Sequence, residues 1–170
     1  MQGNFEIDDV SIRKANAGDV PVIYRFEQDK SECPRSENTL KRFIAVRRNC
    51  TILVAEFDEQ VVGCVICELC LNKLKLLNVT AAEEFHGRGV RTRLIDELIA
   101  TLRPDGPRVL MANVLKSNGA AVSFFPKLGF RNTGVLRDHF DSEKDAIRFE
   151  WELKGYREIA HSTALTDEKS

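Results

Sequence analysis

The stretch of the sequence that decides the fold is residues 74–102, and at its centre stand Glu84-Phe85-His86-Gly87-Arg88-Gly89-Val90-Arg91-Thr92. Residues 74–79 are short and apolar enough for a β-strand. Behind the glycines, apolar side chains recur at the spacing of an amphipathic helix, namely Val90, Leu94, Ile95, Leu98, Ile99 and Leu102. The order of strand, tight turn and helix therefore places two glycines at the start of a helix over residues 89–102.

That placement predicts an anion-binding turn. The first turn of a helix leaves about four backbone N–H groups without partners and carries the positive end of the helix dipole. Gly87 and Gly89 have no β-carbon to hold a ligand away, and Arg88, Arg91 and Arg93 add positive charge. A phosphorylated cofactor is the expected occupant. From this stretch alone, a glycine-containing loop with solvated arginines is an equal alternative.

The composition is that of an ordinary globular protein. The chain has 170 residues, of which 43% are hydrophobic and 30% are charged. This length predicts one domain over residues 1–154 and a polar, flexible tail over residues 155–170. The 25 basic residues nearly balance the 26 acidic ones, which argues against a protein built to coat nucleic acid or an acidic membrane. With no signal peptide and no apolar run of roughly 18 residues, we expect a cytoplasmic protein.

The five cysteines do not predict a metal or disulfide site. Their number is odd, and Cys64, Cys67 and Cys70 have the spacing of part of an iron–sulfur run whose fourth ligand would fall near Leu74. Residues 61–70 also have the pattern of a strand, in which alternate side chains point to opposite faces. Cys64 and Cys70 would then share one face and Cys67 the other. We therefore expect buried, reduced cysteines and no metal.

The remaining segments have the pattern of an α/β protein. We expect further strands over residues 11–15, 51–57, 61–70, 109–114, 130–136 and 146–153. Helices are expected over residues 20–30, 36–47 and 118–128, the first with Asp19 as its cap. The short turn at residues 58–60 joins two of the strands into a hairpin.

Two stretches of the sequence together point to a known family. The first is the strand, glycine turn and helix, and the second reads Asn118-Gly119-Ala120-Ala121-Val122-Ser123-Phe124-Phe125-Pro126-Lys127-Leu128-Gly129-Phe130. They resemble the GCN5-related N-acetyltransferase (GNAT) superfamily, with its motifs Gln/Arg-x-x-Gly-x-Gly/Ala and Asn-x-x-Ala-x-x-Leu/Phe-Tyr-x-Lys-x-Gly-Phe. The order of elements fits from residue 11 to residue 153. The resemblance implies a mixed, largely antiparallel sheet of six to seven strands, flanked by about four helices, in which a splayed parallel strand pair holds acetyl-CoA.

The resemblance also implies which residues hold the coenzyme. The strand before the turn would bind the pantetheine arm through the backbone of Leu77, Asn78 and Val79. The turn would hold the pyrophosphate at His86, Gly87, Arg88, Gly89, Val90, Arg91 and Thr92. Asn118 and Phe125 would line the coenzyme's far side. The implied activity is acetyl transfer from acetyl-CoA to a primary amine, by direct attack on the thioester, with a small molecule, an amino acid, a protein N-terminus or a lysine as acceptor.

Four positions depart from the family pattern. His86 stands where glutamine or arginine is usual, and Arg91 replaces a small residue. Phe125 takes the place of a tyrosine whose hydroxyl protonates the leaving thiolate in many members. Asn113 matches a glutamate found in the branch that acetylates ribosomal proteins, and an amide cannot act as a general base. The resemblance therefore leaves the general acid and the general base unassigned.

The residues themselves supply weak candidates for the base. Glu68 is the one acid in the apolar run 61–70, an environment typical of catalytic carboxyl groups, and a paired structural carboxylate is the alternative. His86 and His139 lie in or near loops, where a surface histidine is the default. A base that acts through a chain of waters also stays open.

Two other classes of function remain. Phe125 and Asn113 would suit a module that binds acyl-CoA without transferring the acyl group. Residues 87–92 could also be a degenerate dinucleotide fingerprint, although a third glycine and a later acidic residue are lacking. We expect the acceptor amine between residues 27–35 and 137–144, no nucleic-acid or membrane partner, and a monomer or homodimer.

Overall fold

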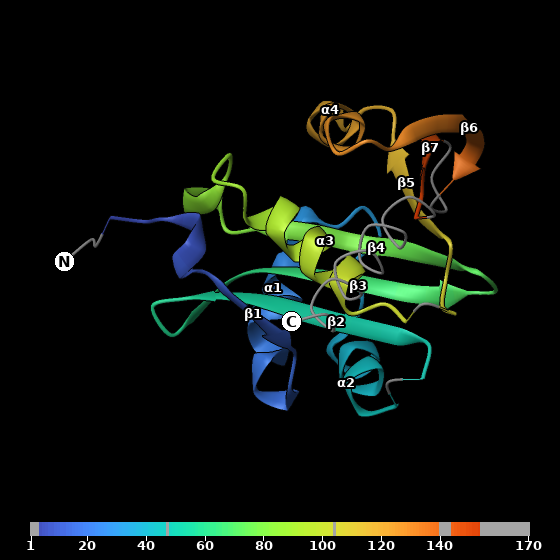
Figure 1. The fold of residues 1–170 in the computed structure, drawn as a ribbon. Coiled ribbons are helices and arrows are strands. Elements are labelled where there is room, and N and C mark those ends of the chain that lie inside the picture. Colours follow the sequence, from blue (N-terminus) through green and yellow to red (C-terminus); the bar gives the residue numbers. More distant parts are fainter. Residues whose placement is uncertain (1–3, 47, 104, 140–143, 154–170) are drawn as a thin grey trace, which may run out of the picture. The chain divides into compact units, whose positions relative to one another are not determined.

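Figure 1 shows the computed structural model, which describes residues 4–46, 48–103, 105–139 and 144–153. Within these ranges the helices are α1 Val20–Lys30, α2 Glu37–Val46, α3 Val90–Ala100 and α4 Gly119–Lys127. The strands are β1 Ser11–Lys14, β2 Cys50–Phe57, β3 Gln60–Cys70, β4 Lys73–Ala81, β5 Val109–Leu115, β6 Arg131–His139 and β7 Lys144–Glu152. Short 3-10 helices are η1 Ile7–Asp9, η2 Ala17–Asp19 and η3 Glu83–Phe85.

The described strands form one seven-stranded sheet in the order β1-β2-β3-β4-β5-β7-β6. The pairs β1 with β2, β2 with β3, β5 with β7 and β6 with β7 are antiparallel. The connection β4–α3–β5 is a strand–helix–strand unit, which makes the sheet mixed. The predicted fold class is confirmed: an α/β protein with a largely antiparallel sheet and four helices in the described part of the chain.

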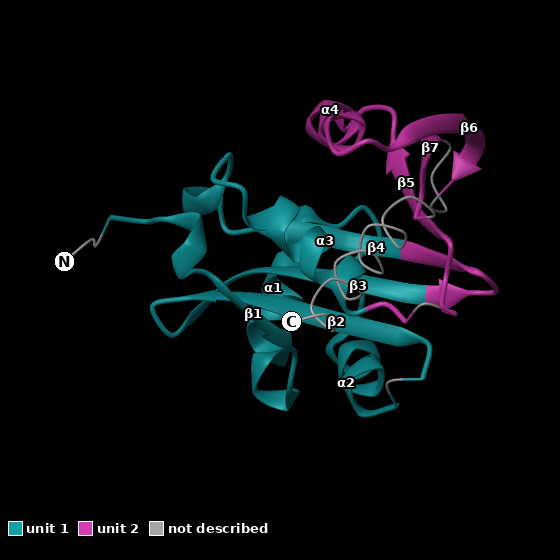
Figure 2. Ribbon diagram, viewed as in Figure 1, with its two compact units in different colours: residues 1–68, 76–101, 140–142 teal, residues 69–75, 102–139, 143–170 magenta. Residues whose placement is uncertain are grey.

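The chain divides into two compact units, coloured separately in Figure 2. Unit 1 contains the chain up to Glu68 and the segment Leu76–Thr101. Unit 2 contains Leu69–Lys75 and the described chain from Leu102 onward. The expectation of a single domain over residues 1–154 stays a prediction, and the predicted tail over residues 155–170 lies outside the described residues.

Unit 1 is built around the hairpin β2–β3. Its two-residue turn, Asp58 and Glu59, has φ angles of 50° and 60°, the left-handed conformation that fits the twist of adjacent strands. Helices α1 and α2 cover one face of these strands, and α3 covers the other (Figure 1). The core under α1 and α2 contains Ala15, Val20, Ile23, Leu40, Ile52, Val54, Cys64 and Ile66.

The other face of unit 1 brings β3 close to the start of α3. A β-carbon added at Gly63 would lie 2.7 Å from the carbonyl oxygen of Thr80 and 3.0 Å from a methyl group of Val90. Glycine is therefore required at this position for steric reasons. Val90, Leu94, Ile95, Leu98 and Ile99 are at most 5% exposed, which confirms the predicted amphipathic helix. It ends at Ala100, two residues before the predicted end.

Unit 2 packs α4 onto β6 and β7 through aromatic rings. Phe125 is 4% exposed and lies stacked on Phe149, with ring centroids 5.8 Å apart. It also contacts Phe124 and Phe130 edge-on, at 5.3 and 5.1 Å. This cluster explains why a helix of nine residues that contains Pro126 is held in place. Its stability comes from buried rings.

Two details of the sequence prediction were wrong. Asp19 precedes α1, but its side chain makes no cap hydrogen bond there. Instead it accepts from the backbone N–H of Asn16 at 2.8 Å and pairs with Arg13 at 2.7 Å. Arg137 and His139, expected in a loop, belong to β6, which continues through a register irregularity. The loop prediction failed because pairing with β7 extends β6, whereas Asn16 and Asp19 form a local capping box.

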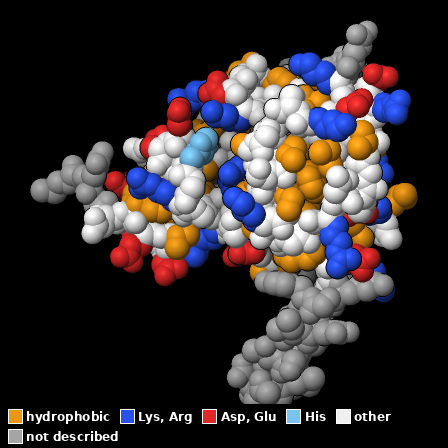
Figure 3. Space-filling model, turned by 90° about the horizontal axis from the view of Figure 1, so that it is seen from above, with side chains coloured by type: hydrophobic (Ala, Val, Ile, Leu, Met, Phe, Trp, Pro, Cys, Tyr) orange, Lys and Arg blue, Asp and Glu red, His pale blue; other side chains and the backbone are white. Residues whose placement is uncertain are grey.

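The surface agrees with the small net charge. On the face drawn in Figure 3, acidic and basic side chains are interspersed. A net charge of −1 gives no electrostatic basis for a broad nucleic-acid footprint. In the part of the chain that the structure describes, no helix has the length and apolar character needed to cross a membrane.

Candidate active site

The glycine turn of unit 1 has the predicted geometry. Gly87 and Gly89 have φ angles of 72° and 87°, and Gly89 is the N-cap of α3 in the left-handed conformation. A side chain at either position would be strained. The turn remains exposed while Val90 behind it is 1% exposed. The main-chain N–H groups of the first turn of α3 are thus presented at an exposed helix end, where an anion is stabilised.

The turn is fixed by its own backbone. Nε2 of His86 lies 2.9 Å from the carbonyl oxygen of Ala81, at the end of β4. The N–H of Phe85 donates to Ala82 at 2.9 Å, and that of Arg88 donates to Phe85 at 3.3 Å. His86, predicted as a cofactor residue, therefore ties the turn to the preceding strand through its side chain. A glutamine or arginine is not needed for that purpose.

The three arginines have different surroundings. Arg88 lies over the rings of Phe5 and Phe85, at 5.3 and 5.9 Å from their centroids. Arg93 pairs with Asp8 at 3.5 Å. Arg91 is half-buried, and burial lowers the pKa of its guanidinium from the usual value. A partly desolvated cation at the start of a helix gains from an anionic neighbour, which supports the predicted role of Arg91.

The N-terminal segment of the described chain packs beside this turn, which the sequence did not indicate. Phe5, Phe57 and Phe85 form an edge-to-face cluster with centroids 5.1 to 5.8 Å apart. An open hollow of about 920 Å³ adjoins them, lined by Asn4, Phe5, Asp9, Phe57, Asp58, Gln60, Val62, Glu84, Phe85 and Arg88. Phe5 lies about eighty residues from Phe85 in the chain, so periodicity could not have linked them.

In the strand predicted to bind the pantetheine arm, the side chains of Leu77 and Asn78 make contacts within unit 1. Leu77 packs against the core under α1 and α2. Nδ2 of Asn78 donates to Oε1 of Glu27 at 2.5 Å. Val79 is half-buried. If this strand binds a ligand as the resemblance implies, the backbone is the part of Asn78 that serves it.

Glu27 is the one wholly buried carboxylate among the described residues. Its Oε2 accepts from the guanidinium of Arg35 at 2.7 Å and from the backbone N–H of Arg35 at 2.9 Å. With Asn78 on Oε1, three hydrogen bonds satisfy the charge. Residues 27–35, expected to line the acceptor cleft, are thus fastened at both ends to one carboxylate.

Two predicted coenzyme residues lie in unit 2. Oδ1 of Asn118 accepts from the N–H of Ala121 at 3.2 Å and so caps α4. Phe125 belongs to the aromatic core described above. The other ten predicted coenzyme residues, Leu77 to Val79 and His86 to Thr92, lie in unit 1. The roles of all twelve stay predictions.

A polar group that sequence reasoning did not assemble lies on β5, β6 and β7 of unit 2. Nδ2 of Asn113 is 3.2 Å from Nε2 of His139. Arg148 is the register partner of Asn113 on the neighbouring strand. Oδ1 of Asn113 and Nε of Arg148 are buried and have no hydrogen-bond partner among the described residues. Buried polar atoms of this kind are rare and call for an explanation.

The remaining residues that the sequence analysis singled out are Glu68 and the cysteines of β3. Glu68 is half-buried near the end of β3, beside its register partner Cys50. Cys64 and Cys67 are buried free thiols, and burial raises the pKa of Cys67 to about 12 and that of Cys64 further. The expectation of buried, reduced cysteines in β3 is confirmed for these two. The described residues contain no group of three or more His, Cys, Asp or Glu that could hold a metal ion.

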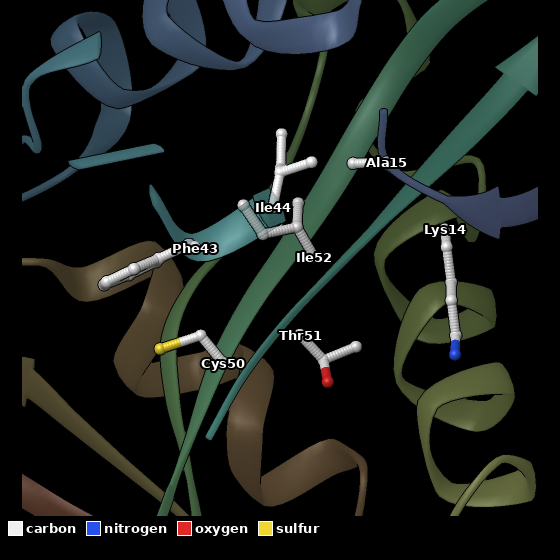
Figure 4. Close-up of a pocket in the computed structure, with 7 residues that line it drawn as sticks. All are labelled: Lys14, Ala15, Phe43, Ile44, Cys50, Thr51 and Ile52. Carbon is white, nitrogen blue, oxygen red and sulfur yellow. The ribbon is translucent and has the colours of Figure 1, made fainter. Parts of the chain in front are cut away.

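A second hollow lies near α2 and is too small for a coenzyme. Figure 4 shows its lining residues, which come from β1, α2 and β2: Lys14, Ala15, Phe43, Ile44, Cys50, Thr51 and Ile52. Its volume of about 50 Å³ has room for water and little else. We assign it no ligand.

The fold and the glycine turn define a class: an α/β protein whose central helix begins at an exposed turn suited to an anion. A family model described as the acetyltransferase (GNAT) family matches residues 20–130. This match spans more than half of the chain. The chain belongs to the acetyltransferase (GNAT) family and is an acetyl-CoA-dependent N-acetyltransferase.

Individual relatives agree with this assignment. The [Ribosomal protein bS18]-alanine N-acetyltransferase of Salmonella typhimurium is 27% identical over 137 residues, covering 76% of this chain and 88% of the relative. The crystal structure of the ribosomal-protein-S18-alanine N-acetyltransferase from Escherichia coli superposes with a TM-score of 0.71 and 23% identity over 84% of this chain and 93% of that one. Arabidopsis thaliana NAA60 in complex with acetyl-CoA gives 0.76 with 15% identity, over 85% and 99%. At these identities the structures show the fold alone.

The family membership decides between the alternatives that the sequence left open. The dinucleotide interpretation of residues 87–92 is excluded, because the family match contains them. A module that binds acyl-CoA without transferring the acyl group fits membership of an acetyltransferase family less well than an active enzyme does. The departures at Asn113 and Phe125 remain, and they bear on how this chain handles protons.

Proposed function

We propose that this chain transfers the acetyl group of acetyl-CoA to the α-amino group of a protein N-terminus. The observation that carries the proposal is the exposed left-handed glycine turn at the start of α3 in a member of the acetyltransferase family. The turn and Arg91 would hold the pyrophosphate, with Leu77, Asn78 and Val79 along the pantetheine arm. Asn118 and Phe125 would line the coenzyme's other side.

The acceptor class follows from the chemistry of the departures. Acetyl transfer needs a neutral amine at the thioester carbon. An α-amino group has a pKa near ~7.8, so about a quarter of it is neutral at pH 7.4, whereas a lysine amine with a pKa near ~10.4 is about 0.1% neutral. A site without the usual glutamate and tyrosine is better suited to an amine that already carries a free lone pair. The activity for which the Salmonella relative is named, alanine N-acetylation of a ribosomal protein, supports the same class.

Two finer expectations belong to this proposal. An acceptor of ribosomal-protein type would place the enzyme in the cytoplasm. A monomer or weak homodimer would suffice, because the proposed residues all come from one chain. No nucleic-acid or membrane partner is needed for the reaction.

A thiol-release assay tests the proposal. Acetyl-CoA is incubated with the protein and one of three acceptors: a peptide with a free N-terminal alanine, the same peptide N-terminally blocked but with an internal lysine, and spermidine. We expect free coenzyme A with the first and little with the others. Release with lysine or spermidine alone would contradict the acceptor class, and tight binding with no release on a wide amine panel would favour the silent module.

A further inference from the structure

The three strands of unit 2 have two different faces. Ala112 and Phe149, register partners on β5 and β7, are buried on the face that carries Phe125 of α4. Because side chains alternate along a strand, Asn113 and its partner Arg148 point to the opposite face. That face carries polar side chains among apolar ones such as Met111 and Ala146, and Glu150 on it pairs with Lys73 at 2.7 Å.

An irregularity in β6 lies just before His139, whose register partner Lys144 is on the same face of β7 as Arg148. The register of β6 and β7 shifts between Leu136 and His139, and Asp138 has a φ of 49°. Such bulges redirect a side chain and are common beside active sites. Here the result is that Nε2 of His139 lies 3.2 Å from Nδ2 of Asn113. A bulge with a strained non-glycine residue is costly to keep unless it serves a purpose.

We propose that His139, held in orientation by Asn113, is the group that accepts the proton of the attacking amine. This inference rests on the proposed function. Asn113 stands in the middle of β5 and cannot itself take a proton, but the imidazole beside it can. The structure thus supplies a base from β6, on the far side of β7, where β5 carries an amide.

The amide suits this task in both protonation states of the ring. Nδ2 donates to an Nε2 that carries a lone pair, as the structure shows. Rotation of the amide by 180° presents Oδ1, which accepts from an Nε2–H of the protonated ring. Oδ1 has no other partner among the described residues, so this exchange costs Oδ1 no hydrogen bond. An asparagine is therefore a good orienting residue for a histidine that gains and loses a proton.

In the part of the chain that the structure describes, charged residues near His139 in register or in sequence lie on two strands. From β7, Arg148 lies opposite Asn113 and the exposed Lys144 is the register partner of His139. From β6 itself, Arg137 and Asp138 are neighbours in the chain. Three of these four groups are cations, and nearby cations disfavour the protonated form of an imidazole.

The reaction balances as a simple acyl transfer. The amine lone pair forms the N–C bond to the thioester carbonyl carbon, and the C–S bond breaks with its electron pair on sulfur. The N–H proton passes to a ring nitrogen of His139, directly or through one water. From the ring it reaches solvent or the thiolate, which leaves as the thiol. No metal, oxidant or further cofactor enters the step.

The test compares wild type with His139→Gln over a range of pH. Glutamine keeps the polarity and approximate size of the side chain but cannot take a proton. Lys41→Gln is the control, because it introduces the same side chain at an exposed, titratable residue of α2, outside the proposed site. Turnover of acetyl-CoA with the free N-terminal peptide is measured from about pH 6 to about pH 9, and thermal melting confirms that each variant is folded.

We expect the ratio of wild-type kcat to that of His139→Gln to rise with pH, reaching on the order of 10²-fold at the alkaline end. At acid pH the wild-type ring is protonated and the two enzymes converge. Ionisation of the acceptor affects both enzymes equally, so it cancels in the ratio. The control should follow wild type at every pH, and KM for the peptide should change little in His139→Gln.

Asn113 is tested as a positioning residue. Asn113→Ala should lower kcat less than His139→Gln does, and Asn113→Asp, which can orient the ring, should retain more activity than Asn113→Ala. A ratio that stays constant with pH, or a change confined to KM, would overturn the assignment of His139 and leave the proposed function standing. Wild type that releases no thiol with any acceptor would overturn both.

Discussion

The carboxylate of Glu27 is 0% exposed and lies 2.7 Å from the guanidinium of Arg35, eight residues further along the chain. This ion pair closes the segment between α1 and α2 into a loop. A hydrogen bond from Nδ2 of Asn78 to Oε1 of Glu27, at 2.5 Å, joins the same carboxylate to β4. One buried charge therefore connects the expected acceptor segment to the expected pantetheine strand.

Arg35→Met should lower the free energy of unfolding by about 3–5 kcal/mol, because it leaves a buried carboxylate without its counter-charge. Urea denaturation measures this. Lys41→Met removes an exposed ion pair, in which Nζ of Lys41 lies 3.7 Å from Oε2 of Glu37. This change should alter the free energy of unfolding by less than about 0.5 kcal/mol. Adding Glu27→Gln to Arg35→Met should recover part of the loss. Equal free energies of unfolding for Arg35→Met and Lys41→Met would contradict a stabilising role for the buried Glu27–Arg35 ion pair.

Gly89→Ala should weaken binding of coenzyme A and cost about 1–2 kcal/mol of stability, since Gly89 has a φ of 87°. Space is not the cause: an added β-carbon would meet Ile7 at 3.6 Å, an ordinary contact. Gly119→Ala is the control, because its φ is not in the left-handed range and its surroundings are open. That change should be neutral or stabilising by about 0.5 kcal/mol. Calorimetry with coenzyme A and thermal melting provide both readouts.

Phe125→Tyr should lower stability and should not raise turnover. The ring is 4% exposed and stacked among Phe124, Phe130 and Phe149. A hydroxyl added there without a partner would cost about 1–3 kcal/mol. An increase in kcat with unchanged stability would instead mean that the hydroxyl reaches the leaving sulfur, as in the tyrosine-bearing members of the family.

Asp19→Asn should flatten the acid limb of the stability profile. Hydrogen bonding from Arg13 holds the pKa of Asp19 below its usual range. A carboxyl whose pKa is lower in the folded state stabilises the fold above its unfolded value, near ~3.9, and loses that contribution as the pH falls further. Wild type should therefore lose more stability between about pH 5 and about pH 2.5 than the variant does. Urea midpoints across this range would contradict the assignment if both proteins fell in parallel.

Local patterns predicted much of the fold because they are carried by neighbouring residues. The helix after Gly89, the hairpin around Asp58 and Glu59, and the cap at Asn118 all follow from spacing and turn chemistry over a few positions. The glycine turn, which is proposed to hold the pyrophosphate, lies at the start of the first of these elements. The family motifs lie on them, which is why the class of reaction could be predicted.

The relationships that matter to the chemistry were beyond local patterns. Asn78 is 51 residues from Glu27, and His139 is 26 residues from Asn113. The second contact further depends on a strand irregularity at Asp138, which no periodicity announces. The sequence marked Asn113 as a missing base. It could not show which side chain stands beside it.

The aromatic contact between Phe5 and Phe85 has a practical result for anyone who purifies this protein. Phe5, Ile7 and Asp8 touch the glycine turn through Phe85, Gly89 and Arg93 respectively. A purification tag fused ahead of them would be attached close to the turn that is proposed to hold the pyrophosphate. Coenzyme affinities measured before its removal would report on the tag as much as on the enzyme.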